Sequence, residues 1–261
     1  MTNHWNDIAN ADCILAIGCN PAENHPASMR WVQKARENGA KLICVDPRFT
    51  RTASQADIFC KMRSGTDIAF IGGMIKYVLD DMDAHPEQYN MPYGLEYTNA
   101  KFLVGATYKG PEALDGVFSG YKPETRSYDR STWEYERDAD GWPKHDKTLK
   151  SPNCVFQVFK KHLARYDVDT VCKITGTPKE TYLEACRTFA ATGRPDRAGT
   201  LLYSMGGTQH TVGVQNVRAY SILQLLLANI GVAGGGINAL RGESNVQGST
   251  DFGLLWDVLP G

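Results

Sequence analysis

The sequence has 261 residues, and its 28 basic and 29 acidic side chains leave a net charge of −1. This balance excludes a general nucleic-acid or polyanion binder, and no apolar run reaches the roughly 20 residues of a membrane-spanning helix. Seven cysteines form no CxxC pair, which argues against a zinc site or an iron–sulfur cluster, and no metal ligand is predicted within the chain.

The first predicted elements form a βαβ unit. Residues 12–17 make a short apolar run, typical of a buried parallel strand, and Gly18 ends it. Apolar residues recur at helical spacing within 27–38, and 41–45 is a second buried strand. Because strand, helix and strand follow closely, the sequence predicts an α/β fold, a Rossmann-like and largely parallel sheet flanked by helices.

The rest of the chain alternates between regular and irregular stretches. Further elements are expected as helices over 68–79, 155–166, 179–192 and 214–229, and as a strand over 200–203. A segment rich in Tyr, Gly, Pro and charge interrupts them. The predicted parts are a first βαβ part (1–80), an aromatic-rich insertion (81–152), a second α/β part of the same domain (153–240), and an arginine loop that starts a further domain (241–261).

Two loops follow the first two strands, at the edge of a parallel sheet where ligands bind. The loop at Gly18 opens a helix but lacks the GxGxxG pattern, so a phosphate site and an ordinary tight turn both stay open. Asp46 is either an acceptor for ribose hydroxyls or a solvated acid that caps its turn. Arg48, Arg51 and Thr52 either meet phosphate oxygens or form a solvated basic turn.

Three further segments could carry chemistry. Residues 65–67 either form a second nucleotide contact or cap a helix. The turn 205–210 follows a strand, and its His210 is either a base or a hydrogen-bonded structural residue. Arg241 lies between three glycines and small polar residues. Its planar fork matches a small carboxylate, although an ion pair to a neighbouring acid is the alternative.

Together these segments resemble the catalytic subunits of respiratory formate dehydrogenases, in the DMSO-reductase family of molybdenum and tungsten enzymes. A single motif of this kind is weak evidence for a family, but six of them in the same order are specific. The matching motifs are TNHW at 2–5, GCNPAENHP at 18–26, VDPRFTRT at 45–52, RSGTD at 63–67, TQH at 208–210 and RGESNVQG at 241–248. In the insertion, Tyr121, Trp133 and Tyr135 also look like this branch of the family.

In that family the cofactor is a molybdenum or tungsten held by two molybdopterin guanine dinucleotides. The resemblance implies that the pyrophosphate of one dinucleotide contacts Gly18, Cys19, Asn20, Glu23 and Asn24. It implies that the sugar and guanine contact Asp46, Pro47, Arg48, Thr50, Gly65, Thr66 and Asp67. It places near the pterin and the metal Met205, Gly206, Gly207, Gln209 and Gly242.

The resemblance also assigns a catalytic residue. Arg241 matches the family's active-site arginine, which is expected to hold the carboxylate of formate while the hydrogen of the C–H bond leaves. Asn245 and Gln247 are expected to orient it. The alternatives are a same-family enzyme that acts on nitrate or on S- or N-oxides, and a free-standing Rossmann-like module that binds NAD or a mononucleotide without redox activity.

Family members carry parts that this sequence lacks. These are an iron–sulfur module with a 4Fe-4S cluster, a selenocysteine or cysteine metal ligand followed by histidine, and a C-terminal domain. The sequence is therefore expected to be the middle section of the subunit and inactive alone. The expected partners are formate, an iron–sulfur electron-transfer subunit and the remainder of the catalytic subunit. A periplasmic location in anaerobic respiration is implied by the resemblance alone.

Overall fold

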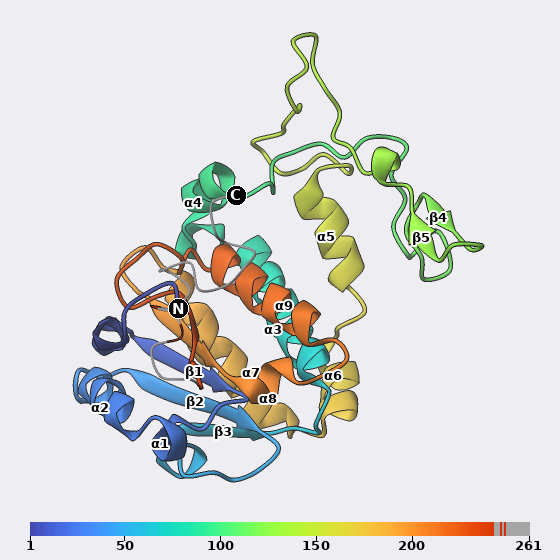
Figure 1. Cartoon of the computed structure of the whole chain (residues 1–261). Helices are drawn as coiled ribbons and strands as arrows, with labels where there is room; N and C mark the ends of the chain where they lie inside the picture. The colour runs from blue at the N-terminus through green and yellow to red at the C-terminus, as the bar shows by residue number, and fades with distance from the viewer. Residues whose placement is uncertain (243–245, 247, 249–261) are drawn as a thin grey trace. The chain divides into compact units, whose positions relative to one another are not determined.

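The computed structural model describes residues 1–242, 246 and 248 (Figure 1). The chain forms two compact units, one of residues 1–90 and 167–261 and one of residues 91–166. The larger unit contains a five-stranded parallel sheet with helices around it, which confirms the predicted α/β class. All the segments singled out as candidate ligand contacts belong to this unit.

The sheet has the strand order β3-β2-β1-β6-β7, and every neighbouring pair is parallel. Its strands are β1 (Cys13–Ile17), β2 (Lys41–Asp46), β3 (Ile58–Lys61), β6 (Gly199–Tyr203) and β7 (Ile237–Ala239). At the centre Leu15 aligns with Ile43 on one side and Leu201 on the other. All five residues of β1 are buried, because helices cover the sheet and apolar side chains are therefore required on both its faces.

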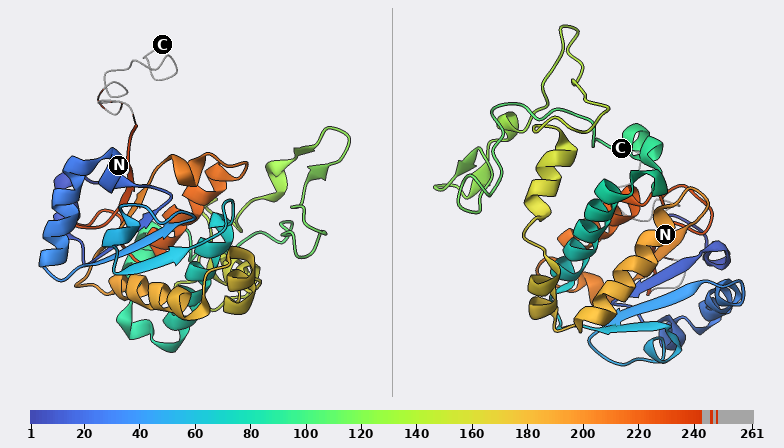
Figure 2. Two further views of the ribbon diagram at one scale, coloured as in Figure 1. Left: turned by 90° about the horizontal axis from the view of Figure 1, so that it is seen from below. Right: turned by 180° about the vertical axis from the view of Figure 1, so that it is seen from behind.

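Helices of the larger unit flank this sheet (Figures 1 and 2). They are η1 (Trp5–Asn10), α1 (Pro21–Asn24), η2 (Pro26–Ser28), α2 (Met29–Glu37), η3 (Ala53–Gln55), α3 (Asp67–Ala84), η4 (Pro86–Gln88), α6 (Val168–Thr175), α7 (Lys179–Ala190), η6 (Ala191–Gly193), α8 (Met205–Thr208) and α9 (Gly213–Leu226). The apolar residues that recur at helical spacing in α2, Met29, Val32 and Ala35, are buried. Figure 2 shows α7 on the opposite face of the sheet from α2, and α3 packs against α9.

Strand β7 was not predicted, because its three residues are too short to show a periodic pattern. A buried glutamine fixes its position instead. The side-chain amide of Gln224 on α9 donates to the carbonyl oxygens of Gly199 and Gly236, at 2.8 and 2.6 Å. These bonds hold the start of β7 beside the start of β6, and the chain then runs along the sheet to Arg241.

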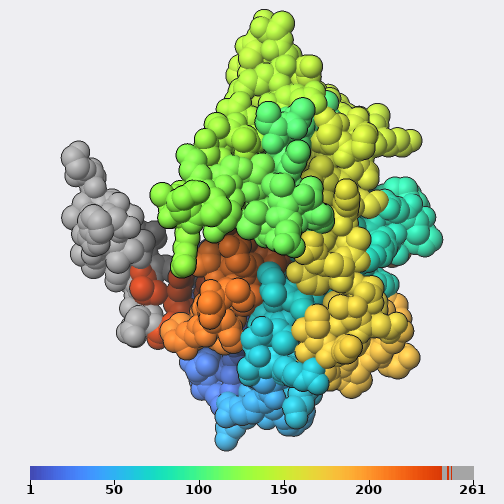
Figure 3. Space-filling view, turned by 90° about the vertical axis from the view of Figure 1, so that its right-hand side faces the viewer, coloured from blue at the N-terminus to red at the C-terminus, as the bar shows by residue number. Residues whose placement is uncertain are grey.

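The smaller unit consists of α4 (Met91–Tyr97), β4 (Tyr121–Lys122), β5 (Ser127–Tyr128), η5 (Arg130–Thr132), α5 (Val155–Leu163) and long irregular stretches. Its bounds, 91–166, differ from those of the predicted insertion, 81–152, and it includes α5. Aromatic rings pack against one another on it, with Trp133 5.8 Å from Phe118 and 5.4 Å from Tyr128 between ring centroids. In Figure 3 its yellow-green tip tapers to a narrow projection. Within the described part of the chain, no helix is long and apolar enough to cross a membrane.

Candidate functional site at the carboxyl edge of the sheet

The predicted ligand-binding segments follow the five strands of the sheet. Because all strands are parallel, their carboxyl ends lie at one edge. Strand β1 is followed by the loop that begins at Gly18, β2 by the loop after its last residue, Asp46, and β3 by the loop that begins at Met62. The α8 turn follows β6, and the stretch that contains Arg241 follows β7. Parallel topology therefore brings together segments that are far apart in the sequence. We call this edge the rim.

Two loops of the rim meet backbone to backbone. Gly18 has a φ of +59°, and a Cβ atom there would lie 2.5 Å from the amide nitrogen of Gly207. A Cβ on Gly206 would lie 2.5 Å from the carbonyl oxygen of Gly18. Real Cβ atoms do not approach that closely, so glycine is required at both positions for steric reasons. The result is that the α8 turn lies directly against the Gly18 loop.

A buried hydrogen-bond network joins the Gly18 loop to the Asp46 loop. The side-chain oxygen of Asn20 accepts from the amide and the hydroxyl of Thr52, at 3.3 and 2.9 Å. The Thr52 oxygen in turn accepts from the amide of Ala22 at 3.1 Å. Thr52 is fully buried, so both predicted alternatives, a phosphate contact and a solvated turn, are wrong for it. Cys19 is also buried, and its thiol donates to the carbonyl oxygen of Leu202.

Replacing Thr52 by valine tests this network. The change leaves the Ala22 amide without its acceptor and removes one of the two donors to the Asn20 side-chain oxygen, which keeps the amide of residue 52. We expect the free energy of unfolding to fall by about 1–3 kcal/mol. Urea denaturation monitored by circular dichroism measures the loss. Thr52→Ser keeps the hydroxyl and is expected to retain most of the stability. If valine and serine cost the same, the network does not stabilise the loop pair.

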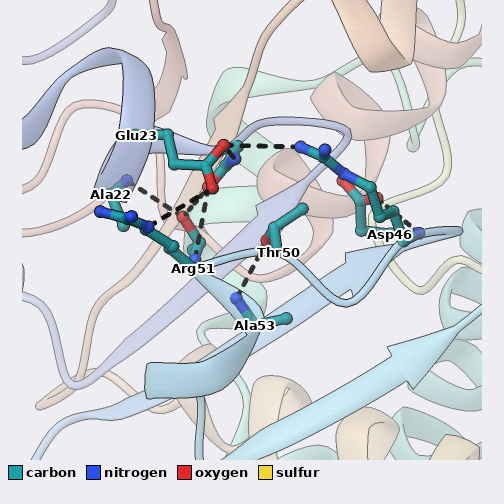
Figure 4. Close-up of polar contacts among 9 residues, drawn as sticks. Ala22, Glu23, Asp46, Thr50, Arg51 and Ala53 are labelled. Carbon is teal, nitrogen blue, oxygen red and sulfur yellow. Dashed lines mark hydrogen bonds and ion pairs between the residues drawn. The ribbon is translucent and has the colours of Figure 1, made fainter.

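Two arginines of the Asp46 loop gather around one glutamate of the Gly18 loop (Figure 4). Glu23 lies 3.5 Å from a guanidinium nitrogen of Arg48 and 3.7 Å from Nε of Arg51, and its carboxylate also accepts from Asn20 at 2.7 Å. The arginine side chains are 71% and 77% exposed, so each ion pair contributes little to stability. The arginines can therefore exchange Glu23 for an anionic ligand at small cost, and one positive charge is in excess.

Asp46 and Thr50 have local partners in the same loop. The Asp46 carboxylate accepts from the amide of Arg48 at 2.8 Å, which is the turn-capping contact of the structural alternative. Partial burial raises the pKa of Asp46, and the Arg48 contacts oppose the rise. The Thr50 hydroxyl oxygen is buried and accepts from the amide of Ala53 at 3.1 Å. Thr50 shapes the loop, whereas Asp46 remains partly exposed at the rim beside Pro47.

The Gly65–Asp67 segment starts α3 without a side-chain cap. The Thr66 hydroxyl donates to the carbonyl oxygen of Arg63 at 2.7 Å, and no side chain caps the helix at Thr66. The Asp67 side chain is 1% exposed, and its Oδ2 lies 3.7 Å from Nε2 of His210. The side-chain cap predicted as the alternative here is therefore wrong. Burial raises the pKa of Asp67.

The α8 turn brings both exposed and buried residues to the rim. Met205 is 58% exposed, whereas Gly207 is buried. His210 forms a hydrogen bond of 2.7 Å to the carbonyl oxygen of Gly206, as its structural alternative predicted. Because Gly206 also contacts Gly18, this short helix places its first residue, Met205, near the Gly18 loop, and Gln209 follows its end.

Arg241 follows β7 at the rim. The amide of Leu240 donates to Tyr203 at 2.8 Å, which extends the pairing of β6 and β7 by one residue. The carbonyl oxygen of Arg241 accepts from Nε2 of His25 at 2.6 Å, which ties it to the Gly18 loop. Arg241 and Gly242 are exposed, and no ion pair involves Arg241 within residues 1–242, 246 and 248. The predicted orienting residues, Asn245 and Gln247, lie outside the described residues.

His25 is a residue of the rim to which the sequence analysis assigned no role. Besides its bond to Arg241, its ring stacks on Trp5 with centroids 5.4 Å apart. It occurs in the GCNPAENHP motif, so a signal was present, but only the fold brings it to residue 241. Nowhere in the described ranges do three or more His, Cys, Asp or Glu side chains gather as a metal site.

Fold and rim together define a Rossmann-like, ligand-binding α/β protein. Residues 1–255 match the molybdopterin oxidoreductase family, and the chain belongs to that family. The curated relatives include the formate dehydrogenase subunit alpha of Megalodesulfovibrio gigas, 58% identical over the whole chain, and the nitrate-inducible formate dehydrogenase major subunit of Escherichia coli, 50% identical. The chain spans 25% of the length of each.

More distant relatives cover the same region. The F420-dependent formate dehydrogenase 1 subunit alpha of Methanococcus maripaludis is 31% identical over the whole chain, which covers 29% of that protein. Among solved structures, acetylene hydratase from Pelobacter acetylenicus aligns with a TM-score of 0.54 and 21% identity, over 87% of this chain and 23% of the hydratase. This last likeness concerns the fold alone. The Megalodesulfovibrio gigas and Escherichia coli relatives, which share half or more of their aligned residues with this chain, are both formate dehydrogenase subunits.

Proposed function

We propose that the chain is the part of a formate dehydrogenase catalytic subunit that binds one arm of a bis-molybdopterin guanine dinucleotide cofactor and supplies the arginine for formate. The observation that carries the proposal is the rim. Segments that follow the five parallel strands meet at one edge, and they hold guanidinium groups, a partly exposed carboxylate and close-packed glycines.

The residues present fit a guanine dinucleotide. Gly18 and Gly206 bring the backbones of the loop after β1 and of the α8 turn into direct contact, and the pyrophosphate lies along these two backbones in this arrangement. Arg48 and Arg51 are exposed cations next to that loop. Asp46 offers carboxylate oxygens to sugar hydroxyls. In this arrangement the pyrophosphate replaces Glu23 as the partner of the two arginines, and Asn24, Gly65 and Thr66 line the path to the guanine. The Asp67 side chain, 1% exposed, is buried and does not contact the guanine in this arrangement.

Arg241 is proposed to hold the substrate. Its guanidinium fork matches the two oxygens of formate, and two parallel hydrogen bonds fix the orientation of the C–H bond. The bond from His25 holds the backbone of Arg241 at the loop proposed for the pyrophosphate. When bound, the cofactor supplies the molybdenum or tungsten centre that takes up the electrons. Met205, Gly207, Gln209 and Gly242 then face the pterin.

The remaining proposals concern the whole subunit. A 4Fe-4S cluster, a selenocysteine or cysteine ligand and an iron–sulfur partner subunit complete the electron path, and the chain alone is inactive in this proposal. The proposed setting is the periplasm, in anaerobic respiration. These proposals rest on the identity to formate dehydrogenase subunits, of which the chain spans a quarter.

Nucleotide binding tests the proposed cofactor site in the chain itself. We expect guanosine diphosphate to bind more tightly than NAD in isothermal titration calorimetry. The double variant Arg48→Gln/Arg51→Gln is expected to weaken guanosine diphosphate binding by about tenfold or more, because two charge-assisted contacts are lost.

Arg187→Gln/Arg197→Gln is the matched control, because it also removes two positive charges, and both arginines are exposed, near or beyond the end of α7 and outside the rim. Tighter binding of NAD than of guanosine diphosphate would contradict the proposed cofactor. Equal weakening by the control and the double variant would show that only the net charge matters.

A further inference from the structure

Four side-chain atoms stand out in the interior of the larger unit. Among the residues that the structure describes, the buried side-chain oxygens without a hydrogen-bond partner are both carboxylate oxygens of Asp67, Oδ1 of Asn216 and the hydroxyl of Tyr220. Their side chains belong to residues that are at most 1% exposed. An unpartnered buried polar atom is costly and therefore calls for an explanation. We call these three residues the acceptor cluster.

The acceptor cluster lies beneath the α8 turn. Asn216 and Tyr220 are one turn apart on α9, and the Asn216 amide donates to the carbonyl oxygen of Gly207 at 3.0 Å. A Cβ on Gly207 would lie 2.7 Å from the Tyr220 hydroxyl. Asp67, at the start of α3, is close enough to this hydroxyl for each group to shift the pKa of the other. The cluster therefore borders both the turn proposed for the pterin and the segment proposed for the guanine.

One partly exposed group connects the acceptor cluster to the rim. The His210 side chain is 23% exposed, and its Nε2 lies 2.7 Å from the Gly206 carbonyl oxygen and 3.7 Å from Oδ2 of Asp67. A carbonyl oxygen only accepts, so Nε2 carries a proton and Nδ1 of the neutral ring is an acceptor. The imidazole thus has one nitrogen able to take up a proton and another, protonated, that faces the buried carboxylate.

The hydrogen-bonding capacity of the cluster is unbalanced. An ionised Asp67 brings only acceptor lone pairs, and the Tyr220 hydroxyl is the one donor among the four atoms. A proton on Asp67 converts an unpaired buried charge into a hydrogen-bond donor. The ionisable groups that act on Asp67 are His210, which favours ionisation, Asp46, which opposes it, and the Tyr220 hydroxyl, which favours it. Burial is the largest influence, and it raises the pKa of Asp67.

We propose that Asp67 is a proton acceptor for the rim and that it receives its proton through His210. This rests on the proposed function, because oxidation of formate to carbon dioxide releases one proton and two electrons. The bound cofactor would take up the electrons, and the proton binds Nδ1 of His210. The Nε2–H bond then breaks as the Oδ2–H bond of Asp67 forms, which leaves the imidazole neutral. The 3.7 Å separation requires a small shift of the ring towards Asp67. Asp67 acts through His210 and does not touch the substrate.

The protonation of Asp67 is measurable in the chain itself. A carbon-13 NMR titration of labelled aspartate, assigned with Asp67→Asn, is expected to give Asp67 a midpoint above its ordinary value of 3.8. His210→Gln is expected to raise the midpoint further, and Asp46→Asn to lower it, because these variants remove opposite influences. A midpoint at or below the ordinary value would overturn the proposal, whatever substrate the whole subunit uses.

The relay itself is tested in a full-length catalytic subunit. Asp67→Asn and His210→Gln are expected to lower kcat for formate by about tenfold or more, with little change in KM and with a changed pH profile. Asp67→Glu is expected to restore part of kcat. Tyr220→Phe keeps both relay residues but removes a hydroxyl that favours ionised Asp67, so its pH profile is expected to keep the wild-type shape and to move to higher pH.

Failure of the relay and failure of the proposed function give different results. If the wild-type subunit does not oxidise formate, the proposed function is wrong, and the NMR titration still decides whether Asp67 holds a proton. If formate is oxidised and both variants keep the wild-type pH profile, the relay through His210 is wrong while the proposed function stands.

Discussion

Replacing Arg241 by lysine in a full-length catalytic subunit is expected to lower kcat/KM for formate by about 10²–10³-fold. Lysine keeps the positive charge but not the planar fork, so the substrate carboxylate loses one of two parallel hydrogen bonds. The C–H bond is then held in many orientations instead of one, and the loss should appear mainly in kcat. Steady-state kinetics at several formate concentrations measure both parameters.

Arg187→Lys provides the matched control, because it makes the same chemical change on an exposed helix away from the rim. Its kinetic parameters are expected to equal those of the wild type. Unchanged formate turnover in Arg241→Lys would remove the role proposed for this arginine. A rise in KM with constant kcat would limit that role to substrate binding.

A second large effect is expected in the fold. Gly18→Ala introduces a Cβ atom 2.5 Å from the amide nitrogen of Gly207, and backbone cannot move aside as a flexible side chain can. The positive φ of +59° adds conformational strain. We expect the free energy of unfolding to fall by about 3 kcal/mol, the range of severe single substitutions. Urea denaturation of the chain measures this loss.

Gly39→Ala separates the two causes. Gly39 also has a positive φ, of +98°, but a Cβ atom there meets nothing within 4 Å. Only conformational strain remains, and the expected cost is about 1–2 kcal/mol. Equal losses at both positions would show that the contact between the Gly18 loop and the α8 turn does not determine stability.

The rim also explains why these glycines and the nearby arginines belong to one site. Gly18 and Gly206 let two loops touch, and the Asn20–Thr52 bonds attach a third. The resulting surface is rigid at its base and carries flexible cations at its edge, because Arg48 and Arg51 are mostly exposed. In the proposed function this rigid base receives the phosphate, and the exposed side chains change partners when the ligand binds.

Sequence by itself determined the strands β1, β2 and β6, the helix α2 and the α/β class. Each of these elements is long enough to show a periodic or continuous apolar pattern. The parallel order then placed the Gly18, Asp46 and α8 segments at one edge without any coordinates. Three of the six motifs that indicated the family, those at 18–26, 45–52 and 208–210, lie in these same segments, as expected where ligand-binding residues occupy the loops between strands.

Tertiary structure alone decided the roles of individual side chains. Strands β3 and β7, of four and three residues, are too short for a pattern and exist through their pairing partners. From the sequence Thr52 is a polar loop residue. In the structure it is fully buried, and its hydroxyl donates to Asn20, 32 positions earlier. The sequence predicts a helix cap at Asp67, but in the structure its side chain is buried beside α9 and His210. Burial depends on contacts between residues distant in sequence, and a local pattern carries no information about such contacts.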